Sequence, residues 1–115
     1  MALLVCFLEK KDESIDWSKK AIYLDQNFYE MVFRYYEHTD RRSPLREMVS
    51  IDYDGEYVMS KSKLKEALAE LDFLRREIAV EHSQIVLFSD VLRMAMSKNC
   101  DLVIGGDMYP DLSRR

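Results

Sequence analysis

The feature that most constrains the fold is an uninterrupted apolar run near the start of the chain, Ala2–Leu8. The run has the length of a strand, and charged residues follow it at once from Glu9. Because successive rather than alternate positions are apolar, both faces of such a strand must be covered. The run therefore predicts a central strand in a sheet that has other elements packed against it.

The same run is as long as a signal-peptide core, but no basic residue precedes it and no small-residue cleavage site follows it. Nowhere does the sequence approach the roughly 20 consecutive apolar residues of a membrane-spanning helix. We therefore expect a cytoplasmic protein. Cys6 lies inside the apolar run, as is typical of a buried thiol. A disulfide with Cys100 would require α-carbons within about 7 Å, which the sequence leaves open.

A helix is predicted over residues 28–36. Its apolar residues recur at intervals of three and four and so share one helical face: Phe28, Met31, Val32, Tyr35 and Tyr36. Asp25 or Asn27 can cap its start by accepting a backbone N–H bond. The polar stretch before Pro44 should end the helix near His38.

An Asp-Gly pair at 54–55 stands between two strand-like runs, 48–53 and 56–59. Such a pair is a strong hairpin signal, because both turn positions must tolerate positive φ. The sequence therefore predicts a β-hairpin in which Ile51 lies opposite Val58.

Residues 61–98 carry two stretches of helical period. The residues of the first that share a face are Leu64, Ala67, Leu68, Leu71, Leu74, Arg75 and Ile78, with lysine and glutamate on the other face. Ser60 or Ser62 can cap the first stretch and Ser83 the second. Two helices are the favoured reading, although no glycine or proline separates them and one bent helix is the alternative.

The remaining segments are shorter. Asn99 is suited to close the last helix, and 101–105 reads as a short buried strand that ends in a glycine turn at 105–106. The charged stretch 10–20 is expected to be a loop with one helical turn around Trp17, and 21–24 is an apolar patch of undecided type.

Strands and helices in this order neither alternate strictly nor separate fully, which favours an α+β fold. We expect one domain over residues 1–115. It should contain about four strands, of which one is N-terminal, two form the Asp-Gly hairpin and one is C-terminal. Three helices should pack mainly on one face of the sheet.

The net charge of −4 is unevenly distributed. Residues 1–60 hold 8 Lys and Arg against 12 Asp and Glu, whereas residues 61–115 hold 9 of each. Affinity for nucleic acids and for anionic membranes depends on Lys and Arg, so neither is an expected partner. An acidic surface suits a protein partner with a basic surface, and it also favours solubility.

No pattern of catalytic or metal-binding residues is recognisable. His38 and His82 lie in polar surroundings, and neither cysteine has a histidine close by in sequence. The Asp-x-Asp-Gly pattern that begins at Asp52 resembles a calcium loop, but Lys63 occupies the twelfth position, where that loop needs glutamate. We expect no catalytic residue, no cofactor and no metal site.

Two features suggest a binding surface. Tyr29 and Phe33 lie off the apolar stripe of the helix at 28–36, so they are either deeply buried or available to a partner. The predicted hairpin mixes tyrosines with carboxylates, a combination common at interfaces, although a solvated turn would look similar. Its candidate partner-binding residues are Asp52, Tyr53, Asp54, Glu56 and Tyr57.

The first functional hypothesis is therefore a small acidic protein-binding module. Bacterial immunity proteins, which bind and neutralise toxin domains, are one class with this general profile, although no motif of such a family matches residue by residue. The alternative is a homo-oligomeric structural or regulatory subunit, a homodimer for instance, that uses the aromatic helix at 28–36 as its contact. A small-ligand-binding protein is the third possibility.

Overall fold

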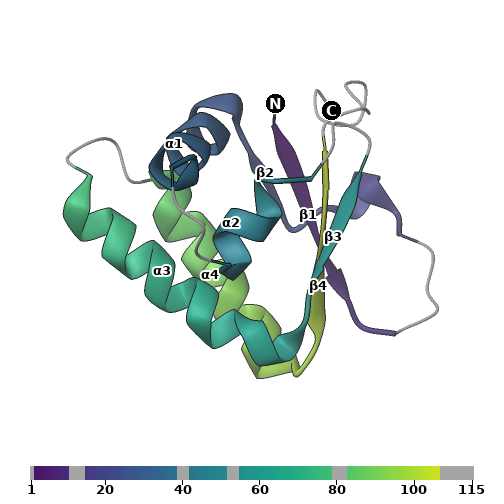
Figure 1. Ribbon diagram of the computed structural model, residues 1–115. Coiled ribbons are helices and arrows are strands. Elements are labelled where there is room, and N and C mark those ends of the chain that lie inside the picture. Colours follow the sequence, from purple (N-terminus) through teal and green to yellow (C-terminus); the bar gives the residue numbers. More distant parts are fainter. Residues whose placement is uncertain (1, 11–14, 39–41, 52–54, 79–82, 107–115) are drawn as a thin grey trace.

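The protein folds around a four-stranded antiparallel sheet with its helices on one face (Figure 1). The computed structural model describes residues 2–10, 15–38, 42–51, 55–78 and 83–106. The strands are β1 (Leu3–Leu8), β2 (Ile22–Leu24), β3 (Glu56–Met59) and β4 (Asp101–Gly106), and they lie in the order β2-β1-β4-β3. This arrangement confirms the predicted α+β class.

The helices are α1 (Gln26–Tyr36), α2 (Pro44–Met48), α3 (Leu64–Glu77) and α4 (Ser83–Lys98). Two short 3₁₀ turns accompany them, η1 (Trp17–Lys19) and η2 (Lys61–Lys63). The helical turn expected around Trp17 is thus present, and the undecided patch at 21–24 forms β2. The split of 61–98 into α3 and α4 confirms the two-helix prediction.

Strand β1 is central, as its apolar run predicted, and both of its faces are covered. Leu3 and Val5 join the main core beneath the helices. Leu4 and Cys6 face the opposite side, where they form a smaller cluster with Trp17 of η1. Alternation along the strand explains why every position had to be apolar.

The glycines at 105–106 lie within β4 instead of forming the predicted turn. A Cβ built on Gly105 would stand 2.6 Å from Cη2 of Trp17, far inside van der Waals contact. Gly105 is therefore required by the indole ring that covers this face of the sheet, and not by a turn.

The predicted hairpin is wrong in its first strand. Met48 ends helix α2, and Val49 and Ser50 form a turn. The helix begins there because the Ser43 hydroxyl accepts the backbone N–H of Arg46, with proline at the first helical position.

Strand β3 therefore pairs with β4 and not with the segment before it. Val58 lies opposite Val103, where the sequence had placed Ile51. Residues 52–54, which include Asp54 of the predicted Asp-Gly turn, lie outside the described residues. The fourth strand of the sheet is β2.

Of the residues predicted to cap the helices, Asp25 and Asn99 do so and Ser60 does not. Asp25 caps α1 by accepting the Phe28 N–H at 2.9 Å, which decides between the two candidates. Ser60 precedes η2 without capping it, because its hydroxyl lies 3.0 Å from that of Ser62. Asn99 closes α4 with φ of 55°, the left-handed conformation typical of that position.

The two cysteines lie on opposite sides of the sheet and form no disulfide. Cys6 belongs to the small cluster with Trp17, whereas Cys100 belongs to the main core. Burial raises the pKa of the Cys6 thiol to about 11, so at neutral pH this group is a protonated, apolar packing element.

Candidate functional site

The second face of α1 presents an exposed aromatic pair. The rings of Tyr29 and Phe33 stack with centroids 5.9 Å apart and planes 19° from parallel. Phe33 is 43% exposed, whereas Tyr29 is partly buried against the main core. The pair thus forms a rigid apolar surface that is open on one side.

A hydrogen bond joins this pair to the end of α2. The Tyr29 hydroxyl donates to the carbonyl oxygen of Val49 at 3.1 Å. A shallow groove of about 240 Å³ lies beside it, lined by Phe33, Tyr36, Glu37, Arg46, Val49 and Ser50. In the sequence, Val49 comes three residues before Asp52, where the acidic segment begins.

The other predicted partner-binding residues are placed unequally. Glu56 is exposed, and it alternates with Tyr57, which packs against the main core beneath the helices. The ammonium of Lys63 lies 5.8 Å from the centre of the Tyr57 ring and 3.6 Å from Glu47. Asp52, Tyr53 and Asp54 lie outside the described residues. Of the others, Tyr29 and Phe33 are in contact, whereas Glu56 is exposed and Tyr57 packs against the core.

A buried carboxylate, which sequence reasoning assigned to the exposed face of its helix, connects three helices. Glu70 of α3 is 6% exposed and accepts the Tyr36 hydroxyl of α1 at 2.6 Å. It also accepts the backbone N–H of Leu45, at the start of α2, at 3.3 Å. The signal was present in the spacing, because Glu70 follows Ala67 by three residues and precedes Leu74 by four.

Two tyrosines near this carboxylate have altered acidity. Burial, with a hydrogen bond to Glu70, holds the pKa of Tyr36 well above its ordinary value. Burial, with the negative charges of Glu47, Glu66 and Glu70 nearby, raises the pKa of Tyr57 to about 12. The Tyr57 hydroxyl is buried and has no hydrogen-bond partner among the described residues.

These shifts predict loss of stability in alkali. An unfolded tyrosine ionises near pH 10.0, whereas Tyr57 in the folded state ionises near pH 12. Between these values the Tyr57 hydroxyl ionises in the unfolded state but not in the folded state. Ionisation stabilises the unfolded state, so the free energy of unfolding falls as pH rises. Urea unfolding across this range measures the fall.

Tyr57→Phe is the matched control for that experiment, because it removes the ionisable group without removing any hydrogen bond to the described residues. The variant should keep its stability at neutral pH and show a shallower alkaline decline. Profiles of the same steepness for the two proteins would contradict the assignment to Tyr57.

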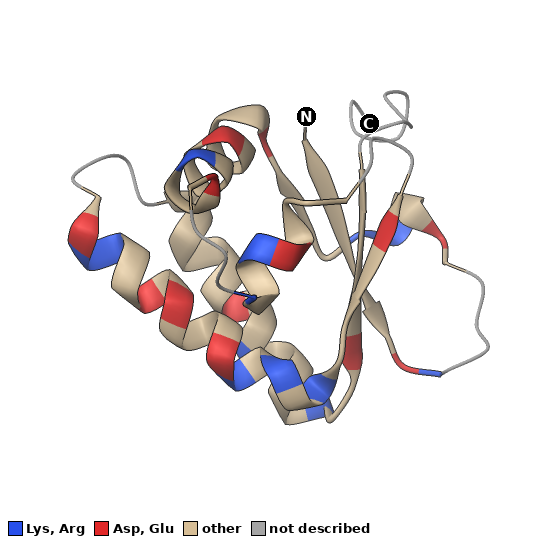
Figure 2. Cartoon of the chain, in the orientation of Figure 1, with Lys and Arg blue, Asp and Glu red and all other residues tan. Residues whose placement is uncertain are grey.

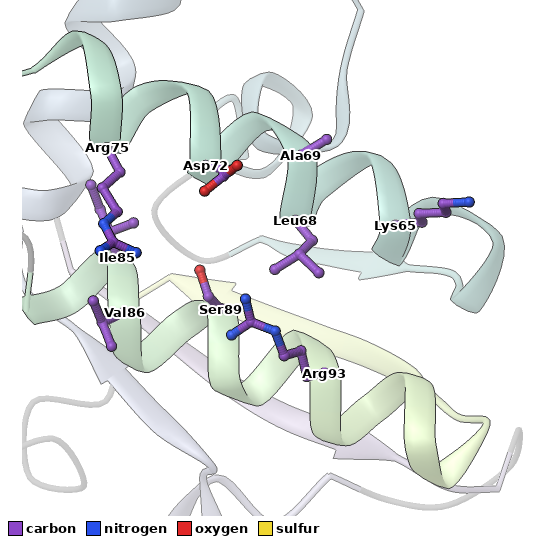
Figure 3. A pocket seen from close by; sticks show the side chains of 9 residues that line it. All are labelled: Lys65, Leu68, Ala69, Asp72, Arg75, Ile85, Val86, Ser89 and Arg93. Carbon is purple, nitrogen blue, oxygen red and sulfur yellow. The ribbon is translucent and has the colours of Figure 1, made fainter.

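A second concave surface lies between α3 and α4 (Figure 3). It has a volume of about 340 Å³ and combines an apolar floor with charged walls. Its lining residues are Lys65, Leu68, Ala69, Asp72 and Arg75 from α3 and Ile85, Val86, Ser89 and Arg93 from α4. Nothing in the sequence pattern marked it, since it forms only where the two helices meet.

Charge on the described part of the chain is balanced, with as many Lys and Arg as Asp and Glu. The two signs are interspersed over the helices and strands (Figure 2). The net charge of −4 therefore comes from the segments outside the described residues, and Asp52 and Asp54 belong to one of them.

Among the described residues, no group of three or more His, Cys, Asp or Glu side chains is arranged to hold a metal ion. His38 is exposed at the end of α1, with its Nε2 3.4 Å from Glu37, and His82 lies outside the described part of the chain. Within the same residues, no helix combines the length and apolarity needed to cross a membrane.

Comparison with protein-family models, with curated proteins and with solved structures finds no match for this chain.

Proposed function

We propose that the chain is a cytoplasmic protein-binding module. Its interface would consist of the aromatic surface of α1, the end of α2 and the acidic segment from Asp52 to Glu56. The observation that carries the proposal is the exposed Tyr29–Phe33 stack, tied by the Tyr29 hydroxyl to Val49. The acidic segment begins three residues after Val49 in the sequence, so we expect a partner that covers the stack to contact it as well.

The stack has the properties of an interface anchor. Aromatic side chains contribute a large contact area, and they dominate binding energy where a partner excludes water around them. Tyr29 is held by both a ring contact and a hydrogen bond, so little conformational freedom remains to be lost on association.

The negative charge of the acidic segment favours a basic partner. Asp52, Asp54 and Glu56 bring three carboxylates within five residues. Carboxylates beside an aromatic anchor favour a protein with a basic surface, because opposite charges accelerate encounter and discriminate against acidic partners. An inhibitor that binds a basic toxin or enzyme domain, as in the immunity class, would need an acidic interface of this kind.

The test begins with capture of a partner from a lysate of the source organism, followed by measurement of its affinity. The triple variant Asp52→Lys, Asp54→Lys, Glu56→Lys should weaken binding at least tenfold, or about 1.4 kcal/mol. The matched control reverses three exposed acids on α3 and α4 and changes the net charge equally: Glu66, Glu77 and Asp90.

Phe33→Ala tests the aromatic half separately. Because Phe33 is 43% exposed, its loss should leave the fold intact and yet weaken binding at least tenfold. If both the triple variant and Phe33→Ala bind the captured partner as tightly as the parent does, the interface lies elsewhere and the proposal is wrong.

The alternative function, a homo-oligomeric subunit, draws support from a second exposed aromatic contact. Tyr35 of α1 and Phe73 of α3 meet edge to face at 6.1 Å, and both are more than two-fifths exposed. Sedimentation velocity at micromolar concentration separates the two functions. A species with the mass of one chain would reject the oligomer, whereas an oligomer that Phe33→Ala dissociates would support it.

A further inference from the structure

The groove between α3 and α4 offers both signs of charge without pairing them. Asp72 and Arg75 lie one turn apart on α3, yet neither forms an ion pair with any described residue. Arg93 on α4 bonds instead to Asp90 of its own helix at 3.2 Å. That pair is exposed, and exposed pairs contribute little, so the Arg93 guanidinium is available to a stronger partner.

A hydroxyl group that opens onto the groove lies between these charges. Ser89 of α4 is 8% exposed, and its side chain forms no hydrogen bond to any described residue. In Figure 3 its oxygen is directed into the groove, toward Asp72 across from it and beside the guanidinium of Arg93. A ligand in the groove can accept a hydrogen bond from this hydroxyl in place of water.

The apolar floor limits what this ligand can be. Leu68 projects between the two helices, and Ile85 and Val86 line the end near Arg75. A volume of about 340 Å³ is near the lower end of the range for small-molecule sites. The groove thus suits a compact molecule with an aliphatic part and separate positive and negative groups.

We propose that this groove binds a free aliphatic α-amino acid. The α-carboxylate accepts from the Arg93 guanidinium and the Ser89 hydroxyl, and the α-ammonium donates to Asp72. The aliphatic side chain covers Leu68 and Val86. A simple anion fits the groove less well, because its carboxylate would lie beside the unpaired negative charge of Asp72 with no ammonium group to offset the repulsion. This site is independent of the proposed interface on α1.

Three probes of nearly equal shape test the proposal on the full chain by amide NMR titration. L-Leucine carries both charges, N-acetyl-L-leucine lacks the ammonium, and L-leucine amide lacks the carboxylate. The last two also stand for the carboxyl and amino ends of a peptide. L-Leucine should shift amide signals over 65–93 and bind at least tenfold more tightly than either derivative.

Variants locate the site. Asp72→Asn and Arg93→Gln, both on exposed side chains, should each reduce the affinity for L-leucine at least tenfold. Arg76→Gln is the matched control, because it removes a charge from the same helix outside the groove, and its affinity should equal that of the parent. The proposal is overturned if millimolar L-leucine shifts no signal in this region, or if either derivative binds as tightly as L-leucine.

Discussion

Replacing Glu70 by alanine is expected to lower the free energy of unfolding by about 3 kcal/mol. The carboxylate is buried and accepts both the Tyr36 hydroxyl and the Leu45 N–H. Its removal takes away the acceptor of both donors in a site that water does not reach freely, and it also leaves a cavity. The Leu45 donor belongs to the first turn of α2, so α2 should loosen first.

Urea unfolding of Glu70→Ala beside Glu66→Ala measures this effect. Glu66 lies one turn earlier on α3 and is exposed, so its truncation should change stability by less than about 0.5 kcal/mol. Glu70→Gln, which retains one acceptor oxygen at nearly the same shape, should fall between the two. Equal stability of the two alanine variants would show that the carboxylate does not hold the three helices together.

Gly105→Ala is expected to lower the free energy of unfolding by about 2 kcal/mol. The added methyl group would lie 2.6 Å and 2.9 Å from Cη2 and Cζ2 of Trp17. The indole ring is 8% exposed and packed in the cluster with Leu4 and Val103, so it can avoid the methyl group only by leaving that cluster. Its departure uncovers the face of the sheet that the helices do not protect.

The chain contains one tryptophan, which makes the displacement directly measurable. The emission of Gly105→Ala should shift to longer wavelength as the ring meets water. In a Trp17→Leu background the same substitution should cost much less, because the atoms it meets are gone. A cost that is the same in both backgrounds would mean that the destabilisation has another origin.

Local patterns in the sequence were sufficient for several elements of this fold. The apolar run at 2–8 predicted a central strand covered on both faces, because only burial on both sides is compatible with unbroken apolarity. The helix at 28–36 and the end of the last helix at Asn99 were predicted from the spacing and chemistry of residues that are close along the chain. Periodicity and capping are properties of short segments, and they survive in the folded protein.

Other features depended on contacts between distant segments. The Asp-Gly pair at 54–55 is a strong local signal for a hairpin, yet capping by Ser43 and burial of Leu45 and Met48 form a helix over Pro44–Met48, where the predicted strand would begin. Strand β3 instead obtains its hydrogen bonds from β4, nearly fifty residues later. Local propensity was overridden because tertiary packing contributes more than a turn preference does.

The candidate sites also combine features that the sequence predicts with features that depend on the tertiary structure. The sequence by itself determined that Tyr29 and Phe33 lie off the core stripe, and that carboxylates gather around residues 52–56. Only the tertiary structure decided that the Tyr29 hydroxyl bonds to Val49, that Glu70 is buried, and that α3 and α4 enclose a groove. Each of these depends on which helix faces are brought together, and that information is spread over the whole core rather than held in one segment.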